Sequence, residues 1–314
     1  MASPLKKVAV LGTGSIGMRH LNTLRQVRNI EPVAISKRDS NFSKLQGVFH
    51  CIIASDTACH VEDTLRTFQY GCHNVLIEKP LAPCVKETLP LLIQTGKAGQ
   101  RIFVGCVLRF SESLNQFRSL LEKIGLVYSV HISCQSYLPN WRPERDYRQS
   151  YSAREKEGGV LLDLIHEIDY AGWIFGWPET LQARLRNLKI LDIQAEETAE
   201  LWWETEGGVS VSIALDYLTR PSRRKMTAYG KEGTLEWDGI SGIVILDLAN
   251  KKRQIFKSHQ TRDEMYLHQL KAFLNTESTS LLATAIEGIK ALSVCDAARL
   301  ASQNRREEPV RYPV

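Results

Sequence analysis

The stretch that most constrains the fold lies near the N-terminus, where an apolar run at residues 8–11 leads directly into a G-x-G-x-x-G pattern. Residues 18–24 follow with the pattern of a helix. A buried strand, a glycine turn and a helix are the context in which this pattern indicates a dinucleotide site. Gly12 permits the tight turn, Gly14 lets a pyrophosphate approach the backbone, and Gly17 allows helix and strand to pack closely. A glycine-rich turn of another α/β protein is the alternative, but the flanking pattern favours the dinucleotide site.

The end of the next predicted strand, residues 31–36, bears on the choice of cofactor. An NAD site commonly places Asp or Glu about 20 residues after the glycines, where the carboxylate holds the ribose 2′-hydroxyl. Here Ser36, Lys37 and Arg38 occupy that place. A hydroxyl and two cations suit a 2′-phosphate, which a carboxylate would repel. The sequence therefore favours NADP(H), while the nearby Asp39 keeps NAD(H) open.

Polar residues also follow the third predicted strand, in the stretch 51–57. Side chains at the carboxyl end of such a strand usually face the cofactor, so Ser55 and Thr57 are candidate contacts. Capping of the next helix by Asp56 or Thr57 is the alternative, and both roles are compatible.

The fourth predicted strand, residues 74–77, ends in Glu78-Lys79-Pro80. A lysine at this position would point into the crevice where ligands of Rossmann folds bind. Pro80 fixes its own φ and could supply a cis peptide bond. The plainer interpretation is a surface turn that contains one charge pair.

Beyond residue 126 the pattern changes to strands that alternate with a period of two. The predicted strands are 127–133, 199–205, 209–215, 226–229, 234–237 and 243–248, and the second and third form a hairpin. We therefore predict an α/β chain with an N-terminal Rossmann domain at 1–122, closed by a helix at 113–124. A C-terminal α+β domain at 123–314 would carry a large, mostly antiparallel sheet that is open on one face. Amphipathic helices at 265–274 and 283–303 would pack against the body.

A second chemically suggestive stretch is residues 158–169, which begins with two glycines. Read as one helix, it places Asp163, His166 and Asp169 in a stripe opposite an apolar face. A carboxylate beside an imidazole orients the ring and raises its basicity, which suits a general base. A solvated helix face with a satisfied histidine is the plainer alternative.

The charge and the cysteines exclude several classes of partner. The net charge is +5, and the densest basic run, residues 220–225, lies between predicted strands, where a solvated loop is the common explanation. No apolar run approaches the roughly 18 residues needed to span a bilayer. The seven cysteines show no C-x-x-C spacing and no common metal-ligand pattern. We therefore expect a cytoplasmic protein that binds no nucleic acid, no membrane and no metal.

Together, the order of these motifs resembles that of the Gfo/Idh/MocA oxidoreductase family, which includes glucose–fructose oxidoreductase and inositol dehydrogenases. The resemblance covers nearly the whole chain and rests on the glycine pattern, Glu78-Lys79-Pro80, Arg109-Phe110, Gly158-Gly159, Asp163, His166-Glu167-Ile168-Asp169 and the C-terminal helix that begins near Glu287-Gly288. It implies a Rossmann domain, a C-terminal domain whose sheet serves substrate binding and dimerisation, and NAD(P)-dependent chemistry on sugars or polyols.

The resemblance also implies catalytic roles for three residues. Lys79 matches the family's catalytic lysine and His166 its general base, while Asp163 approximates the carboxylate partner of that base. The family's spacing from aspartate to histidine is four residues, whereas here it is three. Both spacings place the pair on one helical face. Asp169 is the alternative partner of His166.

The remaining candidate site residues follow from the motifs and the resemblance together. Candidate cofactor contacts are Gly12, Gly14, Ser15, Ile16, Gly17, Ser36, Lys37, Arg38, Ser55, Thr57, His60, Glu78, Lys79 and Arg109. Candidate substrate contacts are Lys79, Arg109, Trp141, Tyr147, Arg148, Asp163 and His166. The stretch 137–148 is rich in aromatics and arginines, which suit a sugar ring with an anionic substituent. It resembles family members associated with surface-polysaccharide or acidic-sugar biosynthesis; an ordered loop over the sheet is the alternative.

These features predict reversible oxidation of a secondary hydroxyl on a sugar, sugar acid or nucleotide sugar. His166 is expected to take the hydroxyl proton while hydride passes to the nicotinamide, and Lys79 to stabilise the charge on oxygen. Two alternatives are a non-catalytic NAD(P)-binding sensor and an enzyme that recycles its bound cofactor. The exposed face of the sheet predicts a homodimer or homotetramer.

Overall fold

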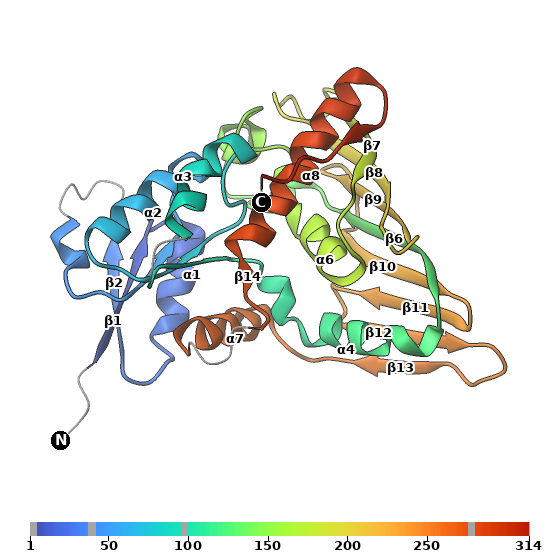
Figure 1. The fold of residues 1–314 in the computed structure, drawn as a ribbon, viewed down its shortest axis with the longest axis horizontal. Helices are drawn as coiled ribbons and strands as arrows, with labels where there is room; N and C mark the ends of the chain where they lie inside the picture. The colour runs from blue at the N-terminus through green and yellow to red at the C-terminus, as the bar shows by residue number, and fades with distance from the viewer. Residues whose placement is uncertain (1–4, 37–41, 96–98, 276–279, 314) are drawn as a thin grey trace. The chain divides into compact units, whose positions relative to one another are not determined.

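The computed structural model describes residues 5–36, 42–95, 99–275 and 280–313. The chain forms two compact units: Met1–Phe110 with Thr261–Leu292, and Ser111–Gln260 with Ser293–Val314. Each unit contains its own sheet (Figure 1). This division differs from the predicted boundary after residue 122. The helix expected at 113–124 lies in the second unit, and residues 261–292 belong to the first.

The first unit is built on a six-stranded sheet in the order β14-β5-β4-β3-β1-β2. Strands β1 to β5 are parallel, and β14 adds an antiparallel edge. Their bounds are β1 Lys6–Leu11, β2 Ile30–Ile35, β3 His50–Ile53, β4 Asn74–Ile77, β5 Arg101–Val104 and β14 Ala283–Thr284. Every residue of β3 and β4 is buried, because helices cover both faces of a parallel sheet. The Rossmann domain that the sequence predicts is confirmed.

Helices complete the core of the first unit. Their bounds are α1 Ser15–Leu24, α2 His60–Gln69, α3 Val85–Thr95, α7 Arg262–Leu274 and the first part of α8 Ala285–Asn304. Helix α7 contacts α1 and the short 3₁₀ turn η3 (Val107–Phe110). Its Leu270 and Phe273 are buried in the same core as Val8. Burial of these apolar side chains explains why residues 261–292 belong to the first unit.

The second unit is built on a nine-stranded sheet in the order β13-β12-β11-β10-β6-β9-β8-β7-β15. Strands β6 and β9 are parallel, and the other neighbouring strands are antiparallel. The bounds are β6 Val127–Gln135, β7 Thr180–Arg186, β8 Thr198–Glu204, β9 Ser210–Asp216, β10 Arg223–Gly230, β11 Gly233–Asp238, β12 Ile243–Leu248, β13 Gln254–Lys257 and β15 Glu308–Pro309. The prediction of a large, mostly antiparallel sheet is confirmed. Strands β7 and β13 were not predicted, because most of their side chains are exposed or half-buried and give a weak hydrophobic pattern.

Helices cover one face of this sheet. Helix α4 (Glu112–Leu120) packs on β11, β12 and β13, while α5 (Val160–Asp163) and α6 (Ile165–Phe175) pack on β6, β8 and β9 (Figure 1). Along β6, Val130, Ile132 and Cys134 are buried, and the intervening His131 is exposed. The other face therefore stays open, as the alternating pattern of the sequence predicts.

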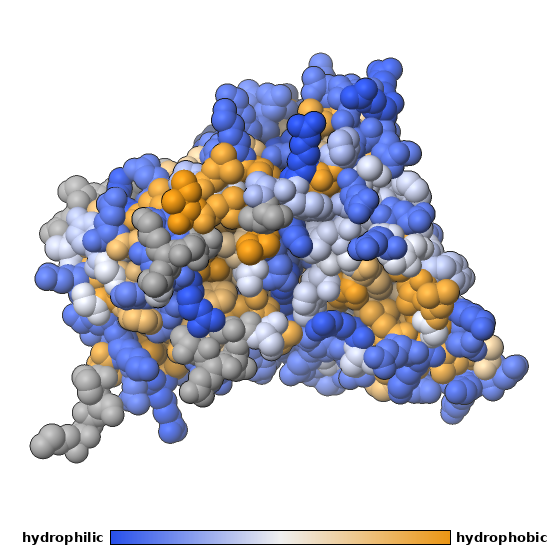
Figure 2. Space-filling model, in the orientation of Figure 1, coloured by the Kyte–Doolittle hydropathy of each residue, from blue (hydrophilic) through white to orange (hydrophobic). Residues whose placement is uncertain are grey.

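The surfaces of both units mix hydrophilic and hydrophobic residues (Figure 2). In the second unit, Ile240 and Ile255 are exposed near β11 to β13. Within the described ranges, no helix has the length and apolar composition that a membrane crossing requires.

Candidate functional site

The glycine turn of the first unit forms a cradle at the N-terminus of α1. Gly12 has a φ of +95°, and a Cβ atom there would overlap the carbonyl oxygen of Ala54. A Cβ at Gly17 would overlap the carbonyl oxygen of Gly12, so only glycine lets α1 and β1 approach this closely. At Gly14, an added Cβ would have no atom of the described residues within 4 Å. Open space therefore lies beside the first turn of α1, where unpaired backbone N–H groups attract anions.

The other cofactor contacts predicted near this cradle lie on two segments. Ser15 and Ile16 begin α1, with Ser15 exposed and Ile16 half-buried. Ser36 directly follows β2 and is half-buried. The predicted 2′-phosphate contacts Lys37 and Arg38 lie outside the described residues.

His60, a predicted cofactor contact, is buried between two loops. Its Nδ1 lies 2.9 Å from the carbonyl oxygen of Pro80, and its Nε2 lies 3.1 Å from that of Ser55. Burial lowers the pKa of His60, although both carbonyls oppose this effect. The hydroxyl of Ser55 donates a 2.6 Å hydrogen bond to Asp63, and the side chain of Thr57 is buried. Since a backbone carbonyl lies at each ring nitrogen, His60 holds the two loops together and leaves no nitrogen for a ligand.

A buried hydrogen bond between an imidazole and a carboxylate holds the turn that carries Lys79. His20, on the inner face of α1, places its Nε2 2.6 Å from Oε1 of Glu78 at the end of β4. Gly105 makes room for this carboxylate, because a Cβ there would lie 3.1 Å from the Glu78 Cδ. Lys79 is half-buried, and its bond to Pro80 is cis. The carboxylate of Glu78 is therefore bound by a side chain of α1. The sequence analysis did not select His20, although its place on α1, shortly after the glycine turn, could have indicated it.

Arg109, predicted to contact both cofactor and substrate, is a buried structural residue. Its side chain is 1% exposed, and Nη1 donates a 2.6 Å hydrogen bond to Glu287 at the start of α8. Glu287 also accepts hydrogen bonds from the backbone and hydroxyl of Thr284. Burial raises the pKa of Glu287, but Arg109 and Thr284 outweigh this effect and lower it overall. The guanidinium therefore joins η3 to α8 within the first unit.

In the second unit, the predicted acid–base stripe is mostly buried. Asp163 and Asp169 are 4% and 2% exposed, while His166, in the first turn of α6, is half-buried. The hydroxyl of Tyr217 donates a 2.6 Å hydrogen bond to Asp163. The negative charge of Asp163 raises the pKa of Tyr151, and burial adds to this effect. The alternative of a solvated helix face is therefore wrong for the two carboxylates, and two tyrosines lie against Asp163.

The helix predicted over 158–169 is broken in the structure. Helix α5 ends at Asp163 and α6 begins at Ile165, so the two segments do not share one continuous helical face. Gly159 has a φ of +86°, and a Cβ there would overlap the carboxylate of Glu196. This carboxylate accepts a 3.2 Å hydrogen bond from the backbone N–H of Leu161, and burial raises its pKa. The glycines before α5 thus serve close packing.

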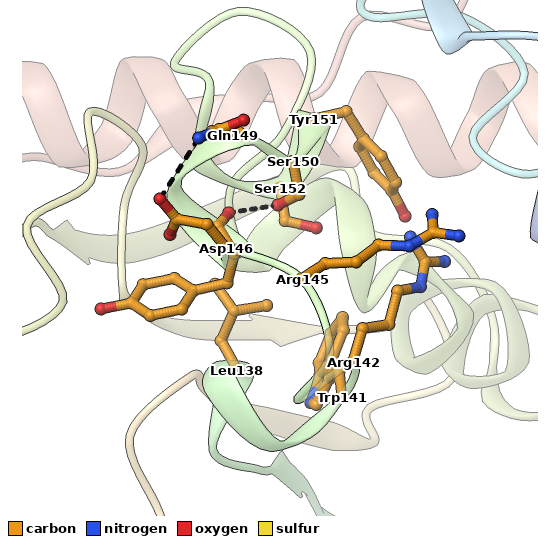
Figure 3. A pocket seen from close by; sticks show the side chains of 10 residues that line it. Leu138, Trp141, Arg142, Arg145, Asp146, Gln149, Ser150, Tyr151 and Ser152 are labelled. Atoms are coloured by element: carbon orange, nitrogen blue, oxygen red, sulfur yellow. Dashed lines mark hydrogen bonds between the residues drawn. The ribbon is translucent and has the colours of Figure 1, made fainter.

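A pocket of about 450 Å³ lies beside these tyrosines in the second unit (Figure 3). Its lining residues are Leu138, Trp141, Arg142, Arg145, Asp146, Tyr147, Gln149, Ser150, Tyr151 and Ser152. Trp141 packs edge-on against Tyr217, with ring centroids 5.4 Å apart. The guanidinium groups of Arg142 and Arg145 extend toward the same region as the hydroxyl of Tyr151 (Figure 3). The predicted contacts Trp141 and Tyr147 therefore line a cavity.

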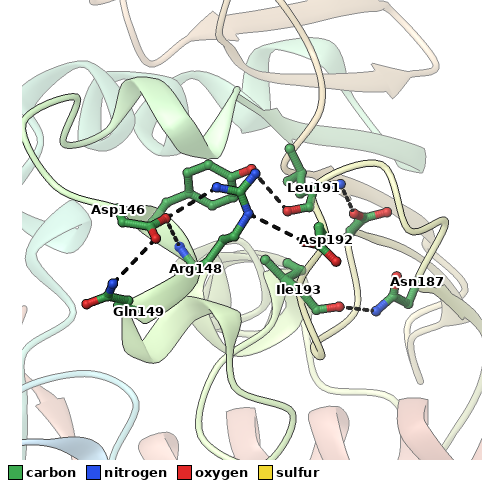
Figure 4. Close-up of polar contacts among 9 residues, drawn as sticks. Asp146, Arg148, Gln149, Asn187, Leu191, Asp192 and Ile193 are labelled. Atoms are coloured by element: carbon green, nitrogen blue, oxygen red, sulfur yellow. Dashed lines mark hydrogen bonds and ion pairs between the residues drawn. The ribbon is translucent and has the colours of Figure 1, made fainter.

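Arg148, the third predicted contact of this stretch, does not line the pocket. Its guanidinium lies 3.5 Å from Asp146 and 3.7 Å from Asp192 and packs on the ring of Tyr147 (Figure 4). The hydroxyl of Tyr147 donates a 3.0 Å hydrogen bond to the carbonyl of Leu191. Arg148 thus anchors the loop, and the pocket arginines are Arg142 and Arg145, which sequence reasoning missed within the same stretch.

The basic run at 220–225 is partly structural and not simply a solvated loop. Arg224 lies in β10, and its Nε donates a 2.8 Å hydrogen bond to the fully buried Glu167. Although burial opposes ionisation, the charge of Glu167 raises the pKa of Arg224. The guanidinium of Arg220 stacks 3.3 Å from the ring centre of Tyr137. Two residues of this run, Arg220 and Arg224, therefore make specific contacts within the second unit.

None of the seven cysteines, all of which lie in the described ranges, forms a disulfide bond. Among the residues that the structure describes, no three His, Cys, Asp or Glu side chains are grouped so that they could hold a metal ion.

The fold defines a two-domain protein whose first unit has the Rossmann fold. The family model of the GFO/IDH/MocA C-terminal domain matches residues 115–236. An uncharacterized oxidoreductase of Synechocystis sp. is 26% identical over 268 residues, which cover 74% of this chain and 71% of the relative. An inositol 2-dehydrogenase/D-chiro-inositol 3-dehydrogenase of Shouchella clausii is 21% identical over 355 residues, which cover 98% and 94% of the two chains.

A solved structure of levoglucosan dehydrogenase with NADH and L-sorbose has the same fold. It superposes with a TM-score of 0.85 at 14% identity and covers 98% of this chain and 100% of that chain. The family model over residues 115–236, the two relatives and the shared fold all indicate the Gfo/Idh/MocA family.

Proposed function

We propose that the protein is a nicotinamide-dependent oxidoreductase that transfers hydride between the cofactor and a secondary hydroxyl or ketone of a sugar, sugar acid or nucleotide sugar. The observation that carries the proposal is that one chain contains both a glycine cradle, in its first unit, and a polar, aromatic pocket beside Asp163, in its second. The similar inositol and levoglucosan dehydrogenases act on a polyol and a sugar, which supports this class of substrate.

The residues of the first unit fit a dinucleotide. The open space at Gly14 and the N–H groups at the start of α1 suit a pyrophosphate, which a larger residue at position 14 would obstruct. Such a cofactor supplies the hydride acceptor or donor. Gly12, Gly14, Ser15, Ile16 and Gly17 would hold its phosphates, and Ser36, Lys37 and Arg38 would select its ribose. His20 and Glu78 would keep the neighbouring turn in place.

The reaction needs a proton acceptor and a positive charge near oxygen. Oxidation breaks the C–H and O–H bonds of one carbinol and forms a C=O bond, so one proton must leave the hydroxyl. We assign this proton to a ring nitrogen of His166. The ammonium group of Lys79 would stabilise the negative charge that develops on oxygen. Asp163, held by Tyr217, would supply the fixed negative charge near the start of α6.

The decisive experiment follows nicotinamide absorbance with purified protein, each cofactor, and a panel of polyols, sugars and nucleotide sugars. Turnover with one class of substrate, lost in Lys79→Ala and in His166→Ala, would support the proposal. Lys86→Ala is a matched control, because Lys86 is exposed on α3. If both site variants kept near-normal turnover, the assignment of roles would be wrong. Cofactor binding without turnover across the panel would favour the sensor or the enzyme that recycles its cofactor.

The proposal includes a preference for NADP(H). Its basis is the sequence Ser36-Lys37-Arg38, which offers cations to a 2′-phosphate and no carboxylate to a 2′-hydroxyl. The ratio of NADPH to NADH affinity should fall in Arg38→Ala, and an unchanged ratio would count against a 2′-phosphate site at this position. Arg28→Ala, a change in an exposed arginine just before β2, is the control.

The proposal also includes a homodimer or homotetramer formed through the open face of the second sheet. Trp202, Ser212 and His131 are aligned across β8, β9 and β6 on this face, and Trp202 is 40% exposed. Light scattering should show that Trp202→Glu lowers the mass of the assembly. Leu300→Glu, which changes an exposed leucine on α8, should leave the mass unchanged.

A further inference from the structure

We infer that the pocket of the second unit binds an anionic group of the substrate, a carboxylate or a phosphate, through Arg142 and Arg145. This inference deepens the proposed function, on which it rests, because it names the charge of the sugar. A volume of about 450 Å³ suits one sugar residue with a charged substituent.

The charges around the pocket leave these two guanidinium groups available. Among the described residues, no ion pair involves Arg142, and the nearest carboxylate to Arg145 is the exposed Glu144 at 4.0 Å. Asp146 also lines the pocket, but its carboxylate accepts hydrogen bonds from the backbone of Arg148 and from Gln149 (Figure 4). An anion placed between two neighbouring guanidinium groups relieves their mutual repulsion.

The geometry favours an anion that is bound by a planar fork of donors. Each guanidinium can donate two parallel hydrogen bonds to a carboxylate or a phosphate, a fit that neutral hydroxyls do not match. Figure 3 shows the two groups extending toward the same side of the pocket as the Tyr151 hydroxyl. The same side therefore offers two guanidinium groups to one anionic group.

The rest of the pocket suits the sugar ring itself. Trp141 and Tyr147 supply aromatic surface, and Trp141 is fixed by a 2.9 Å hydrogen bond from its Nε1 to Ser136. Tyr151 lines the pocket and interacts with Asp163, whose charge raises the pKa of the Tyr151 hydroxyl. A substrate anchored by the arginines would extend toward the buried Asp163.

The test measures binding by isothermal titration calorimetry, with the cofactor present, for matched neutral and anionic sugars. The probes are glucose with glucuronate and glucose 6-phosphate, and galactose with galacturonate. The tightest ligand should be anionic. Its affinity should fall about tenfold to a hundredfold in Arg142→Gln and in Arg145→Gln, because each change removes a charge-assisted contact. The ranking of uronate against phosphate then identifies which anion the pocket accepts.

The control is Arg154→Gln, since Arg154 is an exposed arginine of the same unit that pairs with Glu157 and lies outside the pocket lining. Its affinity should stay within about twofold of the wild type. The inference is overturned if a neutral sugar binds as tightly as its anionic partner, if no anionic probe binds, or if the two pocket variants bind like the control.

The binding readout separates this inference from the proposed function. Arginine-dependent binding of an anionic sugar without turnover would support the pocket and contradict the oxidoreductase. Lysine-dependent turnover of neutral sugars, unchanged in the pocket variants, would support the oxidoreductase and overturn the anionic subsite.

Discussion

The hydroxyl of Tyr217 donates a 2.6 Å hydrogen bond to Asp163, which lies 54 residues earlier in the chain. Both side chains are buried, and burial together with the charge of Asp163 raises the pKa of Tyr217. The carboxylate at the end of α5 is therefore fixed by a residue that follows β9. This bond places a negative charge near the first turn of α6, where His166 lies.

Tyr217→Phe should destabilise the second unit and weaken any activity that depends on Asp163. The variant removes one donor from a buried carboxylate, which costs about 1–3 kcal/mol. Urea unfolding and turnover of the best substrate would measure the two effects. Tyr128→Phe, at an exposed tyrosine of β6, should leave both values unchanged. Equal stability of the two variants would contradict a structural role for the bond.

The glycines of the cradle should differ in what their substitution damages. Gly17→Ala forces a Cβ against the carbonyl of Gly12 and should destabilise the first unit by about 2 kcal/mol or more. Gly14→Ala meets open space and should keep the melting temperature while weakening cofactor binding about tenfold. Thermal unfolding and fluorescence titration with NADPH and NADH would separate the two effects. Equal cofactor affinity in Gly14→Ala and the wild type would argue against a pyrophosphate at this position.

Arg109→Met should destabilise the protein by about 3 kcal/mol, because it leaves the partly buried Glu287 without its cation. The matched control is Arg253→Met, which breaks an exposed pair with Asp247 and should change stability little. Urea unfolding would compare the two variants. If Arg109→Met instead kept its stability but lost much of its ligand affinity, Arg109 would contact the ligand, as the sequence predicts.

Stability should fall as the pH decreases from about 6.5 to about 4, with His50 as one cause. Burial and the charge of Lys6 lower the pKa of His50 from 6.5 to about 4, and its Nε2 lies 3.1 Å from the amide nitrogen of Asn74, which donates to the neutral ring. In this pH window the unfolded chain binds the extra proton, so protonation favours unfolding, and below it both states are protonated.

Urea unfolding at pH 7 and pH 5 would measure this effect. His50→Phe, which keeps an aromatic ring against Phe273, should show a smaller difference between the two pH values than the wild type. His259→Gln, at an exposed imidazole, should keep the wild-type difference. If His50→Phe lost as much stability between pH 7 and pH 5 as the wild type does, His50 would not be a cause of the pH dependence.

Patterns in the sequence correctly predicted the elements that are determined by residues close together in the chain. The role of Gly17 follows from the backbone of one strand–turn–helix segment and could be inferred without the rest of the fold, whereas Gly12 also makes room for Ala54 at the end of β3. Alternation along β6, β8 and β9 predicted a sheet with one buried face, because side chains on a strand point to opposite sides in turn. The same reasoning failed for β13, because its exposed residues give no hydrophobic pattern. It also failed for residues 158–169, where the helix is interrupted between α5 and α6 beside Glu196, and helical periodicity does not reveal this interruption.

The sequence by itself determined the two kinds of sheet, the glycine cradle and the residues proposed for chemistry, since each is set by short-range spacing. Only the tertiary structure decided which polar residues are committed to structure and which line a pocket. Arg109 meets Glu287 across 178 residues, Arg224 meets Glu167 across 57, and Arg148 is bound by Asp192, whereas Arg142 and Arg145 line the pocket. All five are arginines in a sequence with 40 basic residues. Their roles differ because long-range packing sets the burial and the partners of each guanidinium, and no local pattern encodes either.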